Sequence, residues 1–107
     1  MRAWVHWLVA TYELVDDWPE CWYRHDGVVL ELLAMHAWHT AALGVKAAPN
    51  DLFLWHDALW RVRDRVIRPL AQRCGAMGHV DPDEETEGRR ADKLKRMATG
   101  EAEVWKL

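Results

Sequence analysis

The sequence predicts an all-α protein: a small antiparallel three-helix bundle followed by a charged, partly helical C-terminal tail. Apolar residues recur at the three- and four-residue spacing of amphipathic helices in three successive segments. No stretch shows the alternation of apolar and polar residues that is typical of a half-buried strand. The length of 107 residues fits one domain, which we place at 1–79, with the tail at 80–107.

The first helix is predicted at about 3–14, because Trp4, Trp7 and Leu8 lie on one helical face. A loop with two aspartates and a proline follows. The second helix begins near Asp26, with Asp26 or the preceding histidine as its cap, and ends at Gly44, since glycine is a common C-terminal helix signal.

The third helix is predicted to begin after Pro49-Asn50 and to end at Cys74, just before a glycine. Pro69 lies inside it and has no backbone N–H to donate, so we expect a kink or break near 65–69. The polar face carries opposite charges four residues apart, each pair worth about 0.2–0.5 kcal/mol. These pairs are Asp57 with Arg61 and Asp64 with Arg68.

The tail differs from the domain in composition. A glycine-rich break at 75–78 is followed by an acidic block and then by a basic block at 89–96. Few large apolar side chains occur after residue 79. This pattern predicts a solvated segment with one short helix at 87–98.

Composition excludes several classes of protein. The chain contains no serine, so a serine nucleophile is excluded, and it has no run of 18 apolar residues that could span a membrane. The N-terminus is a poor secretory signal, so we expect a cytoplasmic protein. We expect the two cysteines to be reduced thiols. The net charge of −3 gives no general attraction to nucleic acid or acidic lipid.

Histidines fall on the apolar arcs of the predicted helices. Buried polar groups need hydrogen-bond partners, so we expect a buried polar cluster in which His36, His39, His56 and Arg63 meet carboxylates or backbone carbonyls.

The same histidines allow a metal hypothesis. The pattern Cys21-x3-His25-x10-His36-x2-His39 offers four zinc ligands, although its spacing matches no common zinc motif. A second, weaker candidate is Cys74-x4-His79. The alternative is that the histidines only hold the second and third helices together. Nothing marks an oxyanion hole or a catalytic third group, so we do not expect an enzyme.

Eight tryptophans exceed what a core of this size needs, and tryptophan is enriched at binding hot spots. We expect five or six of them to be buried. The candidates for an interaction surface are Trp38 and Trp105 first, and then Trp4 and Trp7.

Arginines on the third helix allow a nucleic-acid hypothesis, because a basic helix can enter the major groove. The residues concerned are Arg61, Arg65, Arg68 and Arg73. Aspartates share that face, which favours a solvated, salt-bridged surface instead.

The segment from Trp22 to His25 resembles a Trp-Cys-Pro-x-Trp-x-x-His motif. That motif belongs to an uncharacterised family of small Trp-rich proteins encoded on actinobacterial plasmids, integrative elements and phages. The resemblance covers about 3–79; its cysteine precedes Trp22 directly, which departs from the motif. The other matching residues are Leu32-Leu33, Ala37-Trp38 and Trp55-His56-Asp57. The resemblance implies a mobile-element or phage accessory protein in a bacterial cytoplasm, and no activity.

Taken together, these observations favour a non-enzymatic accessory protein that acts by protein–protein interaction, with a host or element partner or with a second copy as a homodimer. The first alternative is a DNA-binding accessory factor that uses the arginine stripe. The second alternative is a zinc-binding protein that uses the Cys/His cluster.

Overall fold

The computed structural model describes residues 1–75, 79 and 84–105, and this part of the chain is all-helical. The main helices are α1 (Arg2–Thr11), α2 (Asp26–Ala42), α3 (Asp51–Val62), α4 (Arg68–Cys74) and α5 (Glu84–Trp105). Two short 3-10 helices, η1 (Val15–Asp17) and η2 (Trp22–Arg24), connect α1 to α2. A π-helix, η3 (Arg63–Ile67), joins α3 to α4 without a break.

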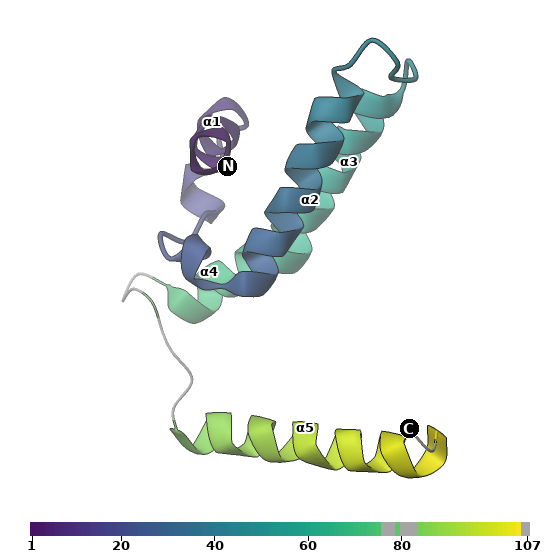
Figure 1. Ribbon diagram of the computed structural model, residues 1–107. Coiled ribbons are helices and arrows are strands. Elements are labelled where there is room, and N and C mark those ends of the chain that lie inside the picture. Colours follow the sequence, from purple (N-terminus) through teal and green to yellow (C-terminus); the bar gives the residue numbers. More distant parts are fainter. Residues whose placement is uncertain (76–78, 80–83, 106–107) are drawn as a thin grey trace.

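Helices α2 and α3 form an antiparallel pair that lies side by side in Figure 1, and α1 packs against one side of it. The centre of the core is Trp55, which is fully buried and donates its indole N–H to the carbonyl of Met35 at 2.8 Å. The largest other side chains with almost no exposure are Leu8, Leu14, Leu32, Leu59 and Ile67. The finer prediction of a three-helix bundle stays a prediction.

The predicted limits of the second helix agree with α2 to within two residues, and those of the third helix agree with the continuous run from α3 through η3 to the end of α4. The first helix ends at Thr11 and not near residue 14. The expected irregularity at 65–69 takes the form of the π turn, which ends at Ile67, directly before Arg68 and Pro69. Proline cannot donate to the carbonyl four residues back, and a π turn accommodates this without ending the helix. The π turn also places Ile67, and not Val66, in the fully buried position.

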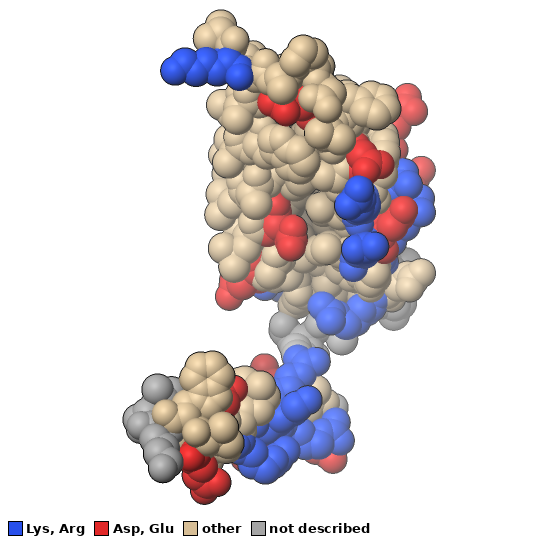
Figure 2. All heavy atoms as spheres, turned by 90° about the vertical axis from the view of Figure 1, so that its right-hand side faces the viewer, with Lys and Arg blue, Asp and Glu red and all other residues tan. Residues whose placement is uncertain are grey.

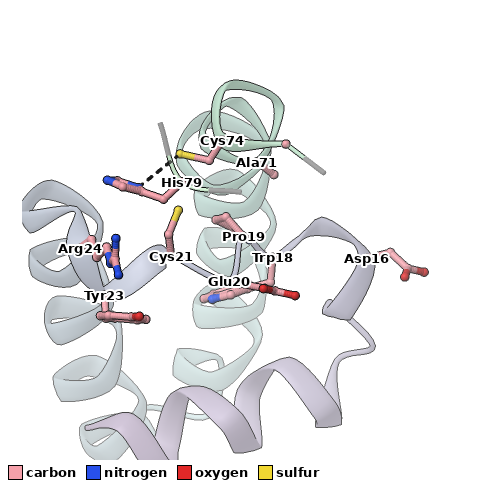
Figure 3. A pocket seen from close by; sticks show the side chains of 11 residues that line it. Asp16, Trp18, Pro19, Glu20, Cys21, Tyr23, Arg24, Ala71, Cys74 and His79 are labelled. Carbon is pink, nitrogen blue, oxygen red and sulfur yellow. Dashed lines mark hydrogen bonds between the residues drawn. The ribbon is translucent and has the colours of Figure 1, made fainter. Parts of the chain in front are cut away.

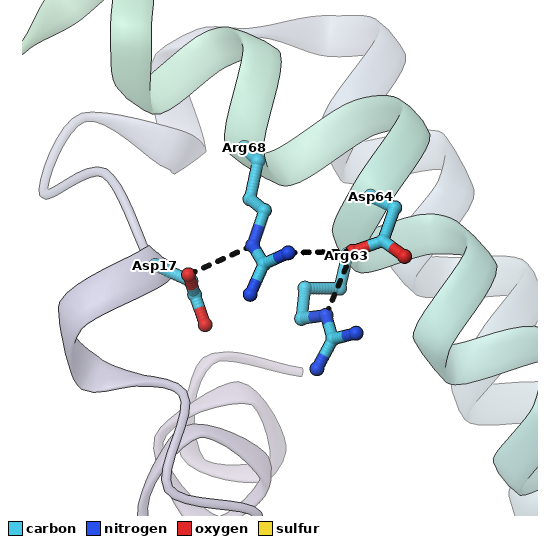
Figure 4. Close-up of polar contacts among 4 residues, drawn as sticks. All are labelled: Asp17, Arg63, Asp64 and Arg68. Atoms are coloured by element: carbon cyan, nitrogen blue, oxygen red, sulfur yellow. Dashed lines mark hydrogen bonds and ion pairs between the residues drawn. The ribbon is translucent and has the colours of Figure 1, made fainter.

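Ionic contacts hold the segment after α1 against the π turn (Figure 4). Arg68 donates to Asp17 at 2.9 Å and to Asp64 at 3.1 Å, and Arg63 donates to Asp64 at 2.9 Å. The hydrogen bond from Arg63 lowers the pKa of Asp64, and the hydrogen bond to Asp17 raises the pKa of Arg68. The predicted pairs Asp57–Arg61 and Asp64–Arg68 are both present.

Helix α5 is longer than the predicted 87–98, and none of its residues is buried. Of the predicted glycine-rich break at 75–78, only Gly75 lies within the described residues. No helix in the described ranges combines the length and the apolar character that crossing a membrane requires. Figure 2 shows a broad uncharged face on the helical core, with acidic and basic side chains interleaved along one edge.

Candidate metal centre

Four metal-ligating side chains converge where η2 meets the end of α4. They are Cys21, His25, Cys74 and His79, and their ligand atoms all lie within 4.8 Å of one another. The sulfurs of Cys21 and Cys74 and the ring of His79 point toward a common centre in Figure 3. The group combines Cys21 and His25, the first half of the predicted four-ligand set, with Cys74 and His79, which the sequence offered as a second candidate.

The distances between these atoms match a tetrahedral ion. The Nε2 atom of His25 lies 3.4 Å from the Cys21 sulfur and 3.6 Å from the Cys74 sulfur. The Nδ1 atom of His79 lies 3.8 Å from the Cys74 sulfur. Zinc binds sulfur at about 2.3 Å and nitrogen at about 2.0–2.1 Å, so tetrahedral angles place sulfur and nitrogen ligands about 3.6 Å apart. The side chains need little movement to hold such an ion.

One turn of 3-10 helix positions the first two ligands. Cys21 and His25 flank η2, and the bonds from Arg24 N–H to the Cys21 carbonyl and from His25 N–H to the Trp22 carbonyl close the turn. Trp22 is buried in the core and anchors this turn. His25 is also the residue that precedes α2, so its ring is fixed at the start of a long helix.

The other two ligands come from the end of α4. Cys74 is the last residue of α4 and is buried. Gly75 follows with φ of +36°, a conformation that side chains with a Cβ rarely adopt. This residue ends the helix, and His79 lies back against Cys74 and His25, with the two histidine rings 4.8 Å apart.

Burial and neighbours decide the chemistry that the centre can support. Burial, together with the adjacent Cys74 side chain, raises the pKa of Cys21, so a metal ion must displace the thiol proton. A hollow of about 710 Å³ borders Cys21, Cys74 and His79 and gives access from solvent. Four protein ligands complete a tetrahedral shell and leave no position for a substrate, which is typical of structural zinc sites.

The structure does not bring together the ligand set Cys21, His25, His36 and His39. His25 directly precedes α2, and His36 lies 11 positions further along the chain, within that helix. This corresponds to about 16 Å along the axis, far beyond the reach of one shared ion. The sequence alone could have excluded this ligand set, because the helical rise between His25 and His36 follows from their spacing. In the structure, Cys74 and His79 complete the group with Cys21 and His25.

His36 and His39 instead join an aromatic cluster between α1, α2 and α3. The Trp4 indole N–H lies 3.5 Å from Nδ1 of His39, and the Trp4 ring lies 4.7 Å from the His36 ring. His56 contacts the Tyr12 hydroxyl at 2.8 Å. The partners of these three histidines are therefore aromatic groups, where carboxylates or backbone carbonyls were expected. Arg63 is not part of this cluster: it pairs with Asp64 and lies over the ring of Trp60.

We expect His39 to make stability depend on pH. Burial first, and then the nearby His36 and His56, lower the pKa of His39 below 6.5. The unfolded chain therefore binds a proton at pH values where the folded chain does not, so the free energy of unfolding falls as the pH drops below about 6.5. Urea unfolding between pH 8 and 5 measures this loss.

His39→Gln is the matched control for this prediction, because it removes the titrating group and leaves the metal ligands in place. The zinc-loaded variant is expected to lose less stability than the wild type over the same pH range. Equal slopes for the two proteins would show that the pH dependence arises elsewhere.

The arginine stripe of the nucleic-acid alternative is partly neutralised. Arg61 and Arg68 are bound to aspartates, whereas Arg65 and Arg73 make no ion pair within the described residues. The acidic partners lower the positive potential that a phosphate backbone would meet.

The tryptophans are less buried than expected. Only Trp22 and Trp55 are buried, while Trp4 and Trp18 are half-buried. Trp38 and Trp105 are exposed, as are Trp7 and Trp60. Of the four candidates for an interaction surface, Trp4 lies mostly inside the aromatic cluster. The expectation of five or six buried tryptophans is therefore wrong.

No protein-family model, curated protein or solved structure matches the chain.

Proposed function

We propose that the chain is a non-catalytic zinc-binding module in which Cys21, His25, Cys74 and His79 hold one Zn²⁺. The observation that carries this proposal is the convergence of two thiols and two imidazoles at sulfur–nitrogen separations of 3.4–3.8 Å. A sulfur–nitrogen tetrahedron is typical of zinc, and two thiolates neutralise the charge of the ion. The zinc would join the N-terminal segment and the end of α4 to a bundle of three antiparallel helices.

The role of such a module is to present surfaces and not to turn over a substrate. A zinc ion with four protein ligands contributes folding free energy and has no open position for catalysis. The accessory, protein-binding role that the tryptophans predict is compatible with this proposal and stays a prediction. The expectation that the protein is encoded on a mobile element or phage also stays a prediction. The exposed aromatic groups Trp7, Trp38 and Trp60 support it.

Native mass spectrometry of protein purified from metal-replete cells tests the proposal. We expect one zinc per chain. Substitution of cobalt for zinc is expected to give the charge-transfer and ligand-field absorption of a tetrahedral site with sulfur ligands. A metal-free protein that does not take up added zinc contradicts the proposal.

Two groups of variants separate the alternative ligand sets. Cys74→Ser and His79→Gln are expected to lose zinc, because both remove ligands of the observed cluster. His36→Gln and His39→Gln are expected to retain it, because these histidines lie in the aromatic cluster. The reverse result would restore the ligand set that the structure separates.

A further inference from the structure

The two sulfurs of the metal centre are neighbours in space, although 53 positions separate them in the chain. Cys21 lies directly before η2 and Cys74 ends α4, and their ligand atoms lie within 4.8 Å of one another. Figure 3 shows both sulfurs projecting into the space between η2 and the end of α4. They are the only cysteines in the sequence, so any disulfide bond within one chain must join these two residues.

Zinc sets the starting distance for such a bond. A tetrahedral ion with zinc–sulfur bonds of about 2.3 Å holds two thiolates about 3.8 Å apart. Closing this gap to a covalent sulfur–sulfur bond needs a movement of about 1 Å by each sulfur, which rotation of the two side chains can supply. Because zinc binds cysteine as the thiolate, both sulfurs are also held in the deprotonated form that reacts with oxidants.

A small oxidant can reach both sulfurs from one side of the centre. The hollow of about 710 Å³ is lined by Cys21, Cys74 and His79. The two cysteines are only 7% and 2% exposed, so the opening admits a molecule of the size of hydrogen peroxide more readily than a bulky disulfide reagent. Burial therefore favours a small, uncharged oxidant.

We infer that Cys21 and Cys74 form a redox-sensitive pair, which hydrogen peroxide converts to a disulfide with release of the zinc ion. This inference rests on the proposed zinc centre. One thiolate attacks a peroxide oxygen, the O–O bond breaks, and a sulfenic acid and a hydroxide form. The second thiolate attacks the sulfenic sulfur, the S–S bond forms, and a second hydroxide leaves. Two protons from solvent convert the hydroxides to water, so the peroxide takes up the two electrons that the thiolates lose.

Oxidation changes what holds the centre together. Zinc keeps two imidazoles at most, too few for its four-coordinate shell, and His79 loses its bond to the metal. The disulfide still joins η2 to the end of α4. A disulfide stabilises a protein by restricting its unfolded chain, and more so when the bonded residues are far apart in sequence. The oxidised, zinc-free protein is therefore expected to stay folded, whereas the reduced, zinc-free protein has neither cross-link.

Treating the zinc-loaded full chain with a small excess of hydrogen peroxide tests this inference. A chromophoric chelator reports zinc release, with an untreated sample as the baseline. Mass spectrometry after trypsin digestion without reductant reports the cross-link. Trypsin cuts after lysine and arginine, so the disulfide joins the peptides 3–24 and 74–89. We expect one zinc ion to be released for each cross-link formed, and dithiothreitol with added zinc is expected to restore the starting protein.

Cys21→Ser is the matched control, because it retains Cys74 and cannot form the bond within one chain. Melting temperatures are compared with chelator present, so that zinc contributes to neither protein. Oxidation is expected to raise the melting temperature of the wild type by roughly 10–30 °C. The same treatment is expected to leave that of Cys21→Ser unchanged.

The outcomes separate the redox pair from the zinc centre itself. A zinc-loaded protein that keeps its metal under peroxide overturns the redox pair and leaves the zinc centre standing. Zinc release with sulfinic acids, or with disulfides between chains, in place of the cross-link between 3–24 and 74–89 has the same meaning. A protein that binds no zinc before peroxide is added overturns the proposed function and the zinc-release step together.

Discussion

Replacing Cys74 by serine is expected to produce one of the two largest stability losses in this protein. The substitution removes one of two thiolates, and weakened binding forfeits the stabilisation that zinc confers on the folded state. With free zinc at about a thousand times the dissociation constant, that stabilisation is about 4 kcal/mol. For a domain of this size it corresponds to a melting temperature lower by roughly 15–30 °C, measurable by circular dichroism.

The chelated wild type is the matched comparison for Cys74→Ser. Once zinc is removed, the two proteins are expected to unfold at nearly the same temperature, and the remaining difference measures the replacement of sulfur by oxygen alone. A wild type whose melting temperature does not respond to chelator contradicts both this prediction and the proposed zinc centre.

The second large effect is expected for Trp55→Ala. Trp55 is fully buried, and its indole N–H donates to the Met35 carbonyl at 2.8 Å. The substitution leaves a cavity between α2 and α3 and removes the hydrogen-bond donor. Truncation of a buried aromatic side chain costs about 3–5 kcal/mol. Urea unfolding of the zinc-loaded protein is expected to show a correspondingly lower midpoint.

Trp60→Ala provides the control for Trp55→Ala. Trp60 lies five residues further along the same helix, but the residue is 36% exposed and its ring packs under the Arg63 guanidinium. Its removal is expected to cost much less than that of Trp55. Similar losses for the two variants would mean that burial at Trp55 is not the main source of its effect.

Much of the helical layout could be predicted from local signals. Gly44 and Pro49-Asn50 delimit the second and third helices, and Pro69 gave the position of the irregularity. The form of that irregularity could not be predicted, because a kink, a break and a π turn all accommodate a missing N–H. The length of α5 also exceeded the prediction, since its interspersed charges stabilise a helix that no core contact supports.

The metal centre could be predicted only in halves. Each Cys/His pair is visible as a short spacing, but 53 positions separate Cys21 from Cys74, and no periodicity relates them. Their meeting depends on how α2 and the helix that ends at Cys74 pack together, which is a tertiary property. The incorrect choice of His36 and His39 came from their proximity in sequence, although helix geometry already separates them from His25.

The aromatic cluster shows a related limit. Helical projection placed His36, His39 and His56 on apolar arcs, and they do lie among core side chains. Their partners could not be predicted, because a buried histidine can be satisfied by a carboxylate, a carbonyl or an indole N–H.

The π turn carries one residue more than an α-helical turn would, and the metal centre depends on how that residue is accommodated. Along an unbroken α-helix from Trp55, the inward positions of the last turns would be those of Val66 and Arg73, but the wider turn gives them to Ile67 and Cys74. If η3 became regular α-helix with the same number of residues, Cys74 would be rotated by about 100° about the helix axis and its sulfur would be carried away from Cys21. A single-codon deletion within Arg63–Ile67 that removed the π turn would instead keep Cys74 in the inward position, because it takes out the residue that the π turn adds. Substitutions that straighten η3 are thus expected to disable the site, whereas the loss of one residue there is expected to leave it intact.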